Sequence, residues 1–229
     1  MAKEKWQVSL HYGLWSLSPV ESIIENVIGD KLGTELKEVI GQEGEYSPNV
    51  NLDSGGNNLA FEIRFYPAGK DGSFSIGLAV EKSELELILE ALPRYELADG
   101  SYFQGSGNGK LLLEPASYHL SFRWDIKPFQ RLHPYIGFGA GIGSLEGYLI
   151  YDELTCEFYD ASTEELAFET YPGGEISLDD LLEYDQKIVL PIIQLNLGLN
   201  FEITNNLHVL LDVGIWDGFL VRGGLSLRL

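Results

Sequence analysis

Hydrophobic and polar residues alternate along most of this chain. Near the start, for example, Trp6, Val8 and Leu10 alternate with Gln7 and Ser9. A period of two is typical of β-strands that have one apolar face. The alternation recurs in eight segments of about 10 residues, the length that a tilted strand needs to cross a bilayer. We therefore predict strands at residues 6–16, 58–67, 73–83, 117–127, 134–144, 191–203, 206–216 and 219–229.

The connections between these segments are either very short or very long. The long ones span residues 17–57, 84–116 and 145–190, and each is followed by a short connection further along the chain. Such a pattern is typical of an up-and-down antiparallel sheet with its tight turns at one end. The sequence therefore predicts an all-β fold, an eight-stranded antiparallel up-and-down barrel formed by a single domain over residues 1–229.

The long connections contain segments with helical periodicity. In the first of them, apolar residues recur every three or four positions, which predicts an amphipathic helix. Its apolar face must be buried, either over the barrel mouth or against the other loops. This face is also a candidate site for an apolar ligand or a protein partner, formed by Ile23, Ile24, Val27, Ile28, Leu32 and Leu36. Residues 83–92 and 177–184 are two shorter helix candidates.

The polar positions of the predicted strands carry charges of both signs, whereas the opposite face is almost entirely apolar. A water-soluble barrel would place the apolar face inside. A transmembrane barrel reverses this arrangement, with apolar side chains against lipid and polar side chains in the lumen. The sequence favours the second arrangement and predicts a charged lumen formed by Glu62, Arg64, Glu81, Arg123, Asp125, Glu202, Asp212, Arg222 and Arg228.

The positions of the aromatic residues favour the same orientation. Five large rings lie on the apolar face, each near the tight-turn end of its strand: Trp6, Phe65, Phe74, Trp124 and Phe201. Aromatic residues form such a girdle where the wall of a barrel crosses a membrane interface. A soluble core has no reason to gather its largest rings at one rim.

One predicted strand has glycine at four alternate positions. In the segment HPYIGFGAGIG, the glycines Gly137, Gly139, Gly141 and Gly143 share one face, opposite Ile136 and Phe138. Glycine normally weakens a strand. The interior of an eight-stranded barrel is just wide enough for side chains to fill. We therefore expect the glycines to face inward and to leave room for larger side chains such as Arg123 and His119.

The inward charges have two interpretations. The spacing allows ion pairs between Arg64 and Glu62 and between Arg123 and Asp125. Further pairs could form between Arg222 or Arg228 and Asp212 or Glu202. Because unpaired buried charges are costly, mutually paired charges that fill the barrel are the favoured interpretation. The alternative is a path for ions.

The chain resembles a known family in these segments. The strand HPYIGFGAGIG, the hairpin LNLGLNFEITNNLHVLLDVGI and the final strand FLVRGGLSLRL look like the small outer-membrane β-barrels of the OmpA, OmpX and OmpW type. The resemblance covers the eight strands and not the long loops. It implies an outer-membrane location, and it departs from the family at the last residue, Leu229, where an aromatic residue is usual. The chain starts without a signal peptide, so we expect that an export signal has been removed.

The charge of the chain is concentrated in the long connections. Residues 17–57, 82–117 and 146–187 together hold 27 acidic and 6 basic residues, whereas the remainder holds 8 and 9. The formal net charge of -20 excludes nucleic acid as a natural partner, since phosphates require a basic face. The acidic loops could bind divalent cations, although no EF-hand spacing is present, and a solvated anionic surface is the simpler interpretation.

No set of residues predicts a catalytic or metal site with any specificity. His119 and Ser121 share a strand face, as in outer-membrane lipid hydrolases, but no acidic partner can be identified. The single cysteine, Cys156, excludes an internal disulfide. We expect a non-enzymatic barrel without a cofactor, which contacts membrane lipids and acts through its acidic outer loops on an extracellular protein. The alternatives are a narrow channel or binding site for small apolar molecules and, less favoured, a lipid-modifying enzyme.

Overall fold

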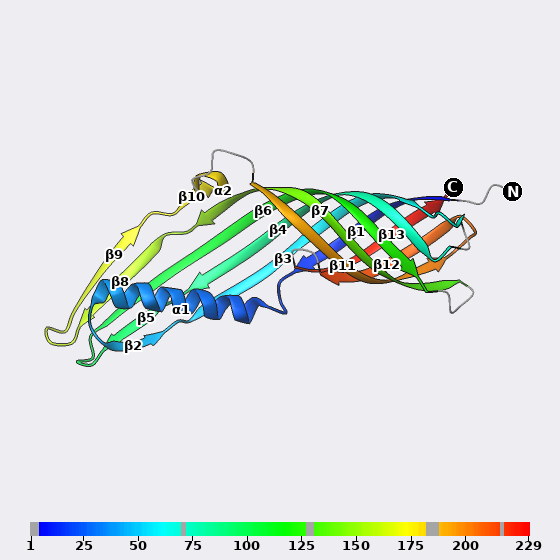
Figure 1. Ribbon diagram of the computed structural model, residues 1–229. Helices are drawn as coiled ribbons and strands as arrows, with labels where there is room; N and C mark the ends of the chain where they lie inside the picture. The colour runs from blue at the N-terminus through cyan, green and yellow to red at the C-terminus, as the bar shows by residue number, and fades with distance from the viewer. Residues whose placement is uncertain (1–4, 70–71, 127–130, 182–187, 216–217) are drawn as a thin grey trace.

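The computed structural model describes residues 5–69, 72–126, 131–181, 188–215 and 218–229 (Figure 1). Within these ranges the chain forms thirteen strands and two helices. The eight long strands are β1 (Trp6–Ser16), β3 (Val50–Phe65), β4 (Phe74–Ala91), β6 (Tyr102–Asp125), β7 (Leu132–Tyr151), β11 (Ile188–Glu202), β12 (Leu207–Ile215) and β13 (Phe219–Arg228). The remaining elements are the helices α1 (Glu21–Ile40) and α2 (Leu178–Leu181) and the strands β2 (Gly44–Ser47), β5 (Arg94–Leu97), β8 (Leu154–Asp160), β9 (Glu165–Tyr171) and β10 (Gly174–Ser177).

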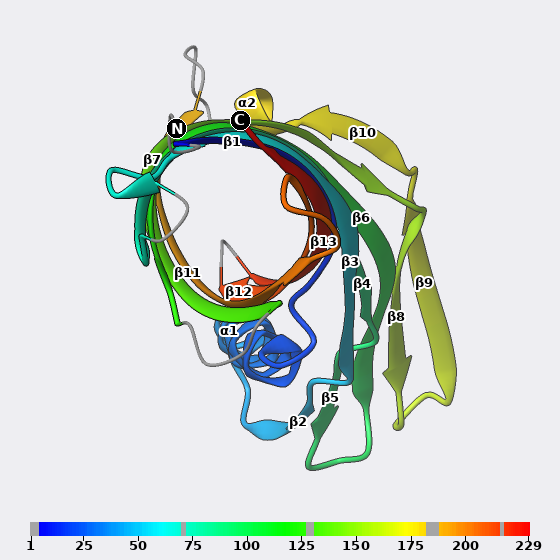
Figure 2. The same ribbon diagram turned by 90° about the vertical axis from the view of Figure 1, so that its right-hand side faces the viewer.

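The eight long strands pair side by side in a closed circuit. β1 pairs with both β3 and β13, and the other antiparallel ladders follow the order β3, β4, β6, β7, β11, β12 and β13. Figure 2 shows this ring, called the barrel below, nearly along its axis. Each of its strands has a neighbour on both sides, so the barrel itself has no open edge. Both chain ends lie at the same end of the barrel (Figure 1).

Four of the barrel strands continue far beyond the ring at the end away from the termini. β6 is the longest, and it pairs along its length with β4 and β7 and then with β5 and β8. β2 pairs with β5, and β9 pairs with β8. We call β2, β5, β8, β9 and the adjoining ends of β3, β4 and β6 the outer sheet. Figure 1 shows it extending to one side of the barrel mouth.

The segments predicted as long connections therefore consist mostly of strands. The prediction of a helix at residues 83–92 is wrong. That segment forms the end of β4, because Leu85, Leu87 and Leu89 continue the period of two that the barrel part of the strand begins. The ends of two predicted strands, residues 127 and 216, lie outside the described ranges. Helix α2 confirms residues 178–181 of the other short helix candidate, 177–184, whereas its last three residues lie in the range 182–187, outside the described residues.

Helix α1 packs on the outer sheet and projects away from the barrel. Its main contacts are with β3, and the backbone N–H of Leu52 donates a hydrogen bond to Glu25 Oε1 at 2.8 Å. In Figure 2 the helix lies outside the outline of the ring. The helix ends at Gly41, whose left-handed backbone lets its N–H reach the carbonyl of Lys37. The predicted helix is thus present, against the strands rather than across the mouth.

The packing inside the barrel generates a first prediction. The ring of Tyr135 fills the space that a Cβ would need at Gly198 on β11, whereas a Cβ at Gly223 on β13 would meet nothing within 4 Å. We expect Gly198→Val to lower the free energy of unfolding by about 1–3 kcal/mol, because the buried ring must move. Gly223→Val is the matched control and should change stability little. Urea titration of both variants in detergent micelles measures the difference, and equal stability would contradict this packing.

Candidate functional site

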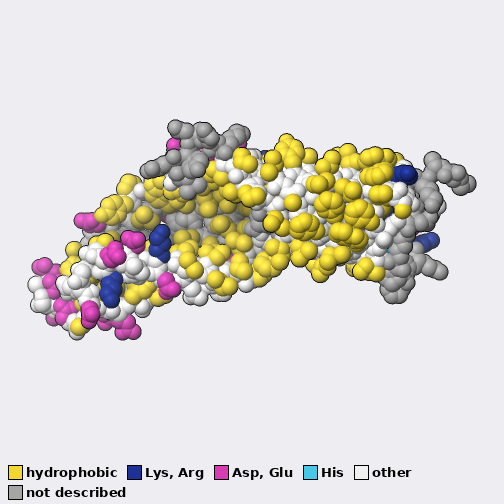
Figure 3. Space-filling model, viewed as in Figure 1, with side chains coloured by type: hydrophobic (Ala, Val, Ile, Leu, Met, Phe, Trp, Pro, Cys, Tyr) yellow, Lys and Arg dark blue, Asp and Glu magenta, His cyan; other side chains and the backbone are white. Residues whose placement is uncertain are grey.

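The two faces of the barrel wall have opposite character. The inward positions of β1, for example, are Gln7, Ser9 and His11, all of which are buried. The outward positions are apolar and exposed: Leu78 is 66% exposed and Ile193 is 68% exposed. Figure 3 shows apolar side chains covering the barrel half of the molecule, while most acidic side chains in view lie at the other end, over helix α1 and the outer sheet. A water-soluble protein buries its large apolar side chains and exposes its charges, so this distribution is inverted.

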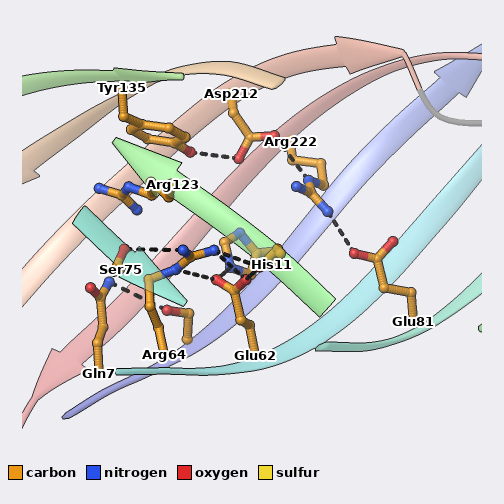
Figure 4. Close-up of polar contacts among 12 residues, drawn as sticks. Gln7, His11, Glu62, Arg64, Ser75, Glu81, Arg123, Tyr135, Asp212 and Arg222 are labelled. Carbon is orange, nitrogen blue, oxygen red and sulfur yellow. Dashed lines mark hydrogen bonds and ion pairs between the residues drawn. The ribbon is translucent and has the colours of Figure 1, made fainter. Parts of the chain in front are cut away.

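The first group of buried charges lies around Arg64 of β3 (Figure 4). Its guanidinium donates two hydrogen bonds to Glu62, from Nη2 to Oε1 at 2.6 Å and from Nε to Oε2 at 3.2 Å. It also donates to Ser121 at 2.8 Å and to Ser75 at 3.1 Å. Ser121 in turn donates to Glu62 Oε1 at 2.8 Å. The bidentate geometry satisfies both charges without solvent.

The second group joins strands from across the barrel. Arg222 donates from Nε to Asp212 Oδ1 at 3.0 Å and from Nη1 to Glu81 Oε1 at 2.7 Å. The remaining carboxylate oxygens are also used, since Tyr135 donates to Asp212 Oδ2 at 2.9 Å and Asn58 donates to Glu81 Oε2 at 3.1 Å. Figure 4 shows this chain of contacts passing from Tyr135 to Glu81. One arginine thus balances two acidic residues.

A third group lies nearer the termini. Arg123 Nε donates to Asp125 Oδ1 at 2.7 Å, and its guanidinium also lies over the ring of Tyr135 at 3.7 Å from the centroid. Arg228 lies 4.0 Å from Asp125 and over the ring of Tyr66. Aromatic faces attract desolvated guanidinium groups, so the two rings help to hold the arginines.

The structure places eight of the nine predicted lumen charges inside the barrel, all buried: Glu62, Arg64, Glu81, Arg123, Asp125, Asp212, Arg222 and Arg228. Glu202 is half-buried beside the turn that joins β11 and β12. Sequence reasoning missed the uncharged members Tyr135, Asn58 and Ser75. The alternation of polar and apolar positions placed these residues on the inward face and could have identified them. Uncharged polar residues are less conspicuous in that alternation than charged ones.

These side chains fill the middle of the barrel. The cavity that they line has a volume of about 20 Å³. That volume is enough for about one water molecule. The glycines predicted to face inward support this packing: a Cβ at Gly139 would lie 2.8 Å from Oε1 of Gln194, and one at Gly143 would lie 2.7 Å from Ile192. At Gly141 a Cβ would meet the carbonyl oxygen of Tyr118 and Nδ1 of His119, while Gly137 has ordinary contacts with Asn196.

The arrangement of His119 and Ser121 does not match a nucleophile with its base. The two residues share the inner face, but the imidazole Nε2 of His119 lies 2.6 Å from the hydroxyl of Ser117. Ser121 is bonded to Glu62 and Arg64 instead. All three residues are buried in the wall of the filled lumen. The spacing that suggested a lipid hydrolase therefore reflects the packing of the lumen.

The aromatic residues predicted at the interface lie on the outer face near the termini. Trp6 packs against Phe65 with ring centroids 4.8 Å apart, and Phe74 packs against Trp124 at 5.3 Å. Phe201, on the far side of the ring, is 46% exposed. The first four rings form cross-strand pairs, which stabilise the sheet as well as the surface.

A second cavity lies where the barrel meets the outer sheet. Along β1, β4 and β6 the inward side chains change from polar to apolar, for example from His11 to Trp15 and from Glu81 to Leu85. The cavity has a volume of about 320 Å³ and is almost entirely apolar, with a lining of Trp15, Leu17, Leu85, Leu87, Leu113, Pro115, Gly143, Ser144, Leu145, Leu190 and Ile192. Sequence analysis missed this cavity, which we call the mouth pocket.

The six apolar residues expected to form one site on helix α1 lie on two different faces of the helix. Ile24, Ile28, Leu32 and Leu36 are half-buried and face the outer sheet, whereas Ile23 and Val27 are exposed. A helix that packs with one face against a sheet leaves the other face in solvent, so these six residues do not form one surface. The mouth pocket, which is concave, is the better candidate for an apolar ligand.

Among the described residues, no group of three or more His, Cys, Asp and Glu side chains is placed to hold a metal ion. The proposed binding of divalent cations by the acidic loops stays a prediction. No helix in the described part of the chain is both long enough and apolar enough to span a membrane.

Comparison with known proteins gives matches at the level of solved structures alone. No protein-family model and no curated protein sequence matches the chain. Similar structures include the translocator domain of the autotransporter NalP from Neisseria meningitidis, with 11% identity, a TM-score of 0.31 and coverage of 98% of this chain and 88% of that one.

Two further examples are the β domain of the Bordetella autotransporter BrkA and the KdgM porin. The former has 7% identity, a TM-score of 0.33 and coverage of 98% and 100% of the two chains. The latter has 11% identity, a TM-score of 0.25 and coverage of 96% and 99%. Because all three TM-scores are below 0.5, the description of the fold rests on the strand pairings given above.

The lumen contacts generate a second prediction. Arg222→Ala would leave the carboxylates of Asp212 and Glu81 buried without their cation, so we expect a loss of about 3–5 kcal/mol in the free energy of unfolding. Lys110→Ala is the control, because it removes an exposed ion pair with Glu86 at 2.8 Å. Such pairs contribute about 1 kcal/mol or less. Unfolding in detergent by guanidinium chloride measures both variants, and losses of the same size would show that the lumen charges are not buried.

Proposed function

We propose that this protein is a non-enzymatic β-barrel of an outer membrane, which carries an acidic outer sheet and helix to the cell surface for contact with other molecules. The inverted polarity of the barrel wall is the observation that carries this proposal. A continuous apolar outer surface over buried charges is stable only when hydrocarbon replaces water around it. The closed circuit of pairings meets the second requirement of a membrane, because it satisfies the backbone hydrogen bonds without water.

The division of charge supports the same orientation. The acidic excess lies in the three long connections, and in Figure 3 acidic side chains lie at the far tip of the outer sheet. The aromatic pairs mark the other end of the barrel, where Trp6 and Trp124 lie at the rim. With the termini and tight turns on the periplasmic side, the outer sheet and α1 project from the cell surface. A packed lumen favours a structural or surface-interaction role over conduction.

A charge on the outer wall tests this proposal. Leu120 lies in the middle of the wall, between Leu78 and Ala140 on the neighbouring strands. We expect Leu120→Arg to cost about 2–4 kcal/mol in lipid vesicles, as arginine does at the bilayer midplane. Val39→Arg, on the exposed face of helix α1, is the matched control and should have little effect.

The measurement is the free energy of unfolding from vesicles, with the mobility of boiled and unboiled samples on SDS gels as a check of folding. An equally small effect of both substitutions would argue that this face does not meet hydrocarbon. So would a folded monomer that stays soluble without detergent.

The mouth pocket favours a second candidate function, the binding of a small apolar molecule. Its volume of about 320 Å³ is at the lower end of the range for ligand sites. Apolar walls would take up a linear hydrocarbon chain, and the buried polar side chains deeper in the barrel would stop it from passing further. In this candidate function, the packed lumen closes the inner end of the pocket and does not form a channel.

Fluorescent fatty-acid binding tests the second candidate. Leu85 is buried in the pocket, and we expect Leu85→Gln to weaken the binding of a dansyl-labelled undecanoic acid by about tenfold, because a polar amide would line the site. Leu89→Gln is the control, since Leu89 lies on the same strand outside the pocket. Equal binding by the two variants would place the ligand elsewhere.

A further inference from the structure

Strand β9 is the long open edge of the outer sheet. It pairs with β8, and within the described ranges it has no second neighbour. All seven of its residues are exposed, including Phe168 at 72% and Leu166 at 55%. Figure 2 shows β9 at the outermost side of the sheet, away from the ring and from α1. An edge of this kind presents unpaired backbone N–H and C=O groups to an added strand.

Apart from the charges of Glu165 and Glu169, strand β9 lacks the devices that usually protect an edge. It contains no proline, lysine or glycine that would interrupt pairing, and its seven residues form one uninterrupted ladder with β8. Strands β2 and β10, by comparison, are four residues long, and Tyr46 of β2 is half-buried next to α1. β9 is therefore the edge best suited to accept a further strand.

The side chains of β9 define the chemistry of that strand. Glu165, Ala167 and Glu169 point to one face of the sheet, whereas Leu166 and Phe168 point to the other. On an added strand, the two residues opposite Glu165 and Glu169 would be four positions apart and would point to the same face of the sheet. Opposite charges paired across strands are stabilising, and so are apolar side chains opposite Leu166 and Phe168.

The surroundings strengthen the preference for a cationic partner. Strand β8 adds Glu157 and Asp160, and Glu164 precedes β9. Residues 146–181 contain no lysine or arginine at all. A second copy of this chain would bring the same acidic surface against this one, which disfavours self-pairing.

We propose that β9 binds an extended peptide segment of a partner protein by adding it as a further β-strand, and that this segment carries basic residues at positions i and i+4 with apolar residues at i+1 and i+3. This inference rests on the proposed surface role and specifies its site and partner. Backbone hydrogen bonds to β9 supply the pairing. The two glutamates and Phe168 select the sequence.

The test uses synthetic peptides and the folded protein, residues 1–229, in detergent. The probe is a labelled peptide with the sequence Thr-Lys-Val-Thr-Val-Lys-Thr, blocked at both ends. One control is the same composition ordered Thr-Thr-Val-Lys-Lys-Val-Thr, in which adjacent lysines point to opposite faces. The other control is the probe N-methylated at alternate residues, which keeps the charge but removes the backbone donors on one edge. We expect fluorescence anisotropy to show binding of the probe and binding about tenfold weaker for each control.

A charge reversal separates specific pairing from general attraction. Glu165→Lys with Glu169→Lys should abolish binding of the probe and allow binding of the corresponding peptide with glutamate in place of lysine. Glu153→Lys with Glu175→Lys changes the net charge equally at exposed positions outside β9 and should preserve binding of the probe. Hydrogen exchange should show new protection confined to residues 165–171.

Several results would overturn the proposal. These are no binding by the folded protein, equal binding of the N-methylated peptide, equal loss in both charge-reversal variants, or protection outside β9. Self-association that Phe168→Arg abolishes would identify a second copy as the occupant and would also overturn it. The gel-mobility and vesicle measurements of the barrel are independent of the peptide. A negative peptide result with a membrane-inserted barrel therefore rejects this partner and leaves the membrane assignment intact.

Discussion

The narrow interior of a ring of eight strands is the constraint on which the rest of this structure depends. Side chains from opposite walls meet there, so every inward charge needs a partner on another strand or a neighbouring position. Arg222 illustrates the solution, because it contacts both Asp212 on the adjacent strand and Glu81 across the barrel. Where a wall position has no side chain, as at Gly139 and Gly143, a neighbour fills the space.

The same alternation that directs charges inward directs apolar side chains outward. A wall built in this way is stable in hydrocarbon and unstable in water, and its closed circuit of ladders gives each strand of the ring a hydrogen-bonded neighbour on both sides. In the proposed function, this barrel is the part that holds the protein in the membrane. Strands β3, β4 and β6 continue outward from the barrel, so the outer sheet is an extension of barrel strands and not a set of separate loops.

The strands no longer form a closed ring beyond the barrel mouth. The two surfaces that are open to other molecules, the mouth pocket and the edge of β9, lie in this region. Inward positions that no longer face an opposite wall can be apolar without filling the lumen, and Trp15, Leu85 and Leu113 line the mouth pocket. Further out, the sheet must end at an edge. The acidic residues around β9 keep this edge soluble and select what can pair with it.

Much of the barrel could be predicted from the amino-acid sequence. The strand β1, the orientation of the two faces, the pairing of Arg64 with Glu62 and the inward glycines all follow from a period of two, which is a local property of the chain. The full lengths of β3, β4, β6 and β7, which extend beyond the ring, could not be predicted in the same way. Segments such as 83–92, rich in leucine and glutamate, fit a helix and a strand alike, and pairing with β3 and β6 decides between them.

The contacts across the barrel also depended on the folded arrangement. Glu81 and Arg222 are 141 positions apart, and only the register of several consecutive ladders brings them together. The mouth pocket and the open edge of β9 have the same origin, because each depends on where pairing stops. Alternation along the chain determines which way a side chain points; the stagger and ends of the strands, set by the whole sheet, determine what it meets.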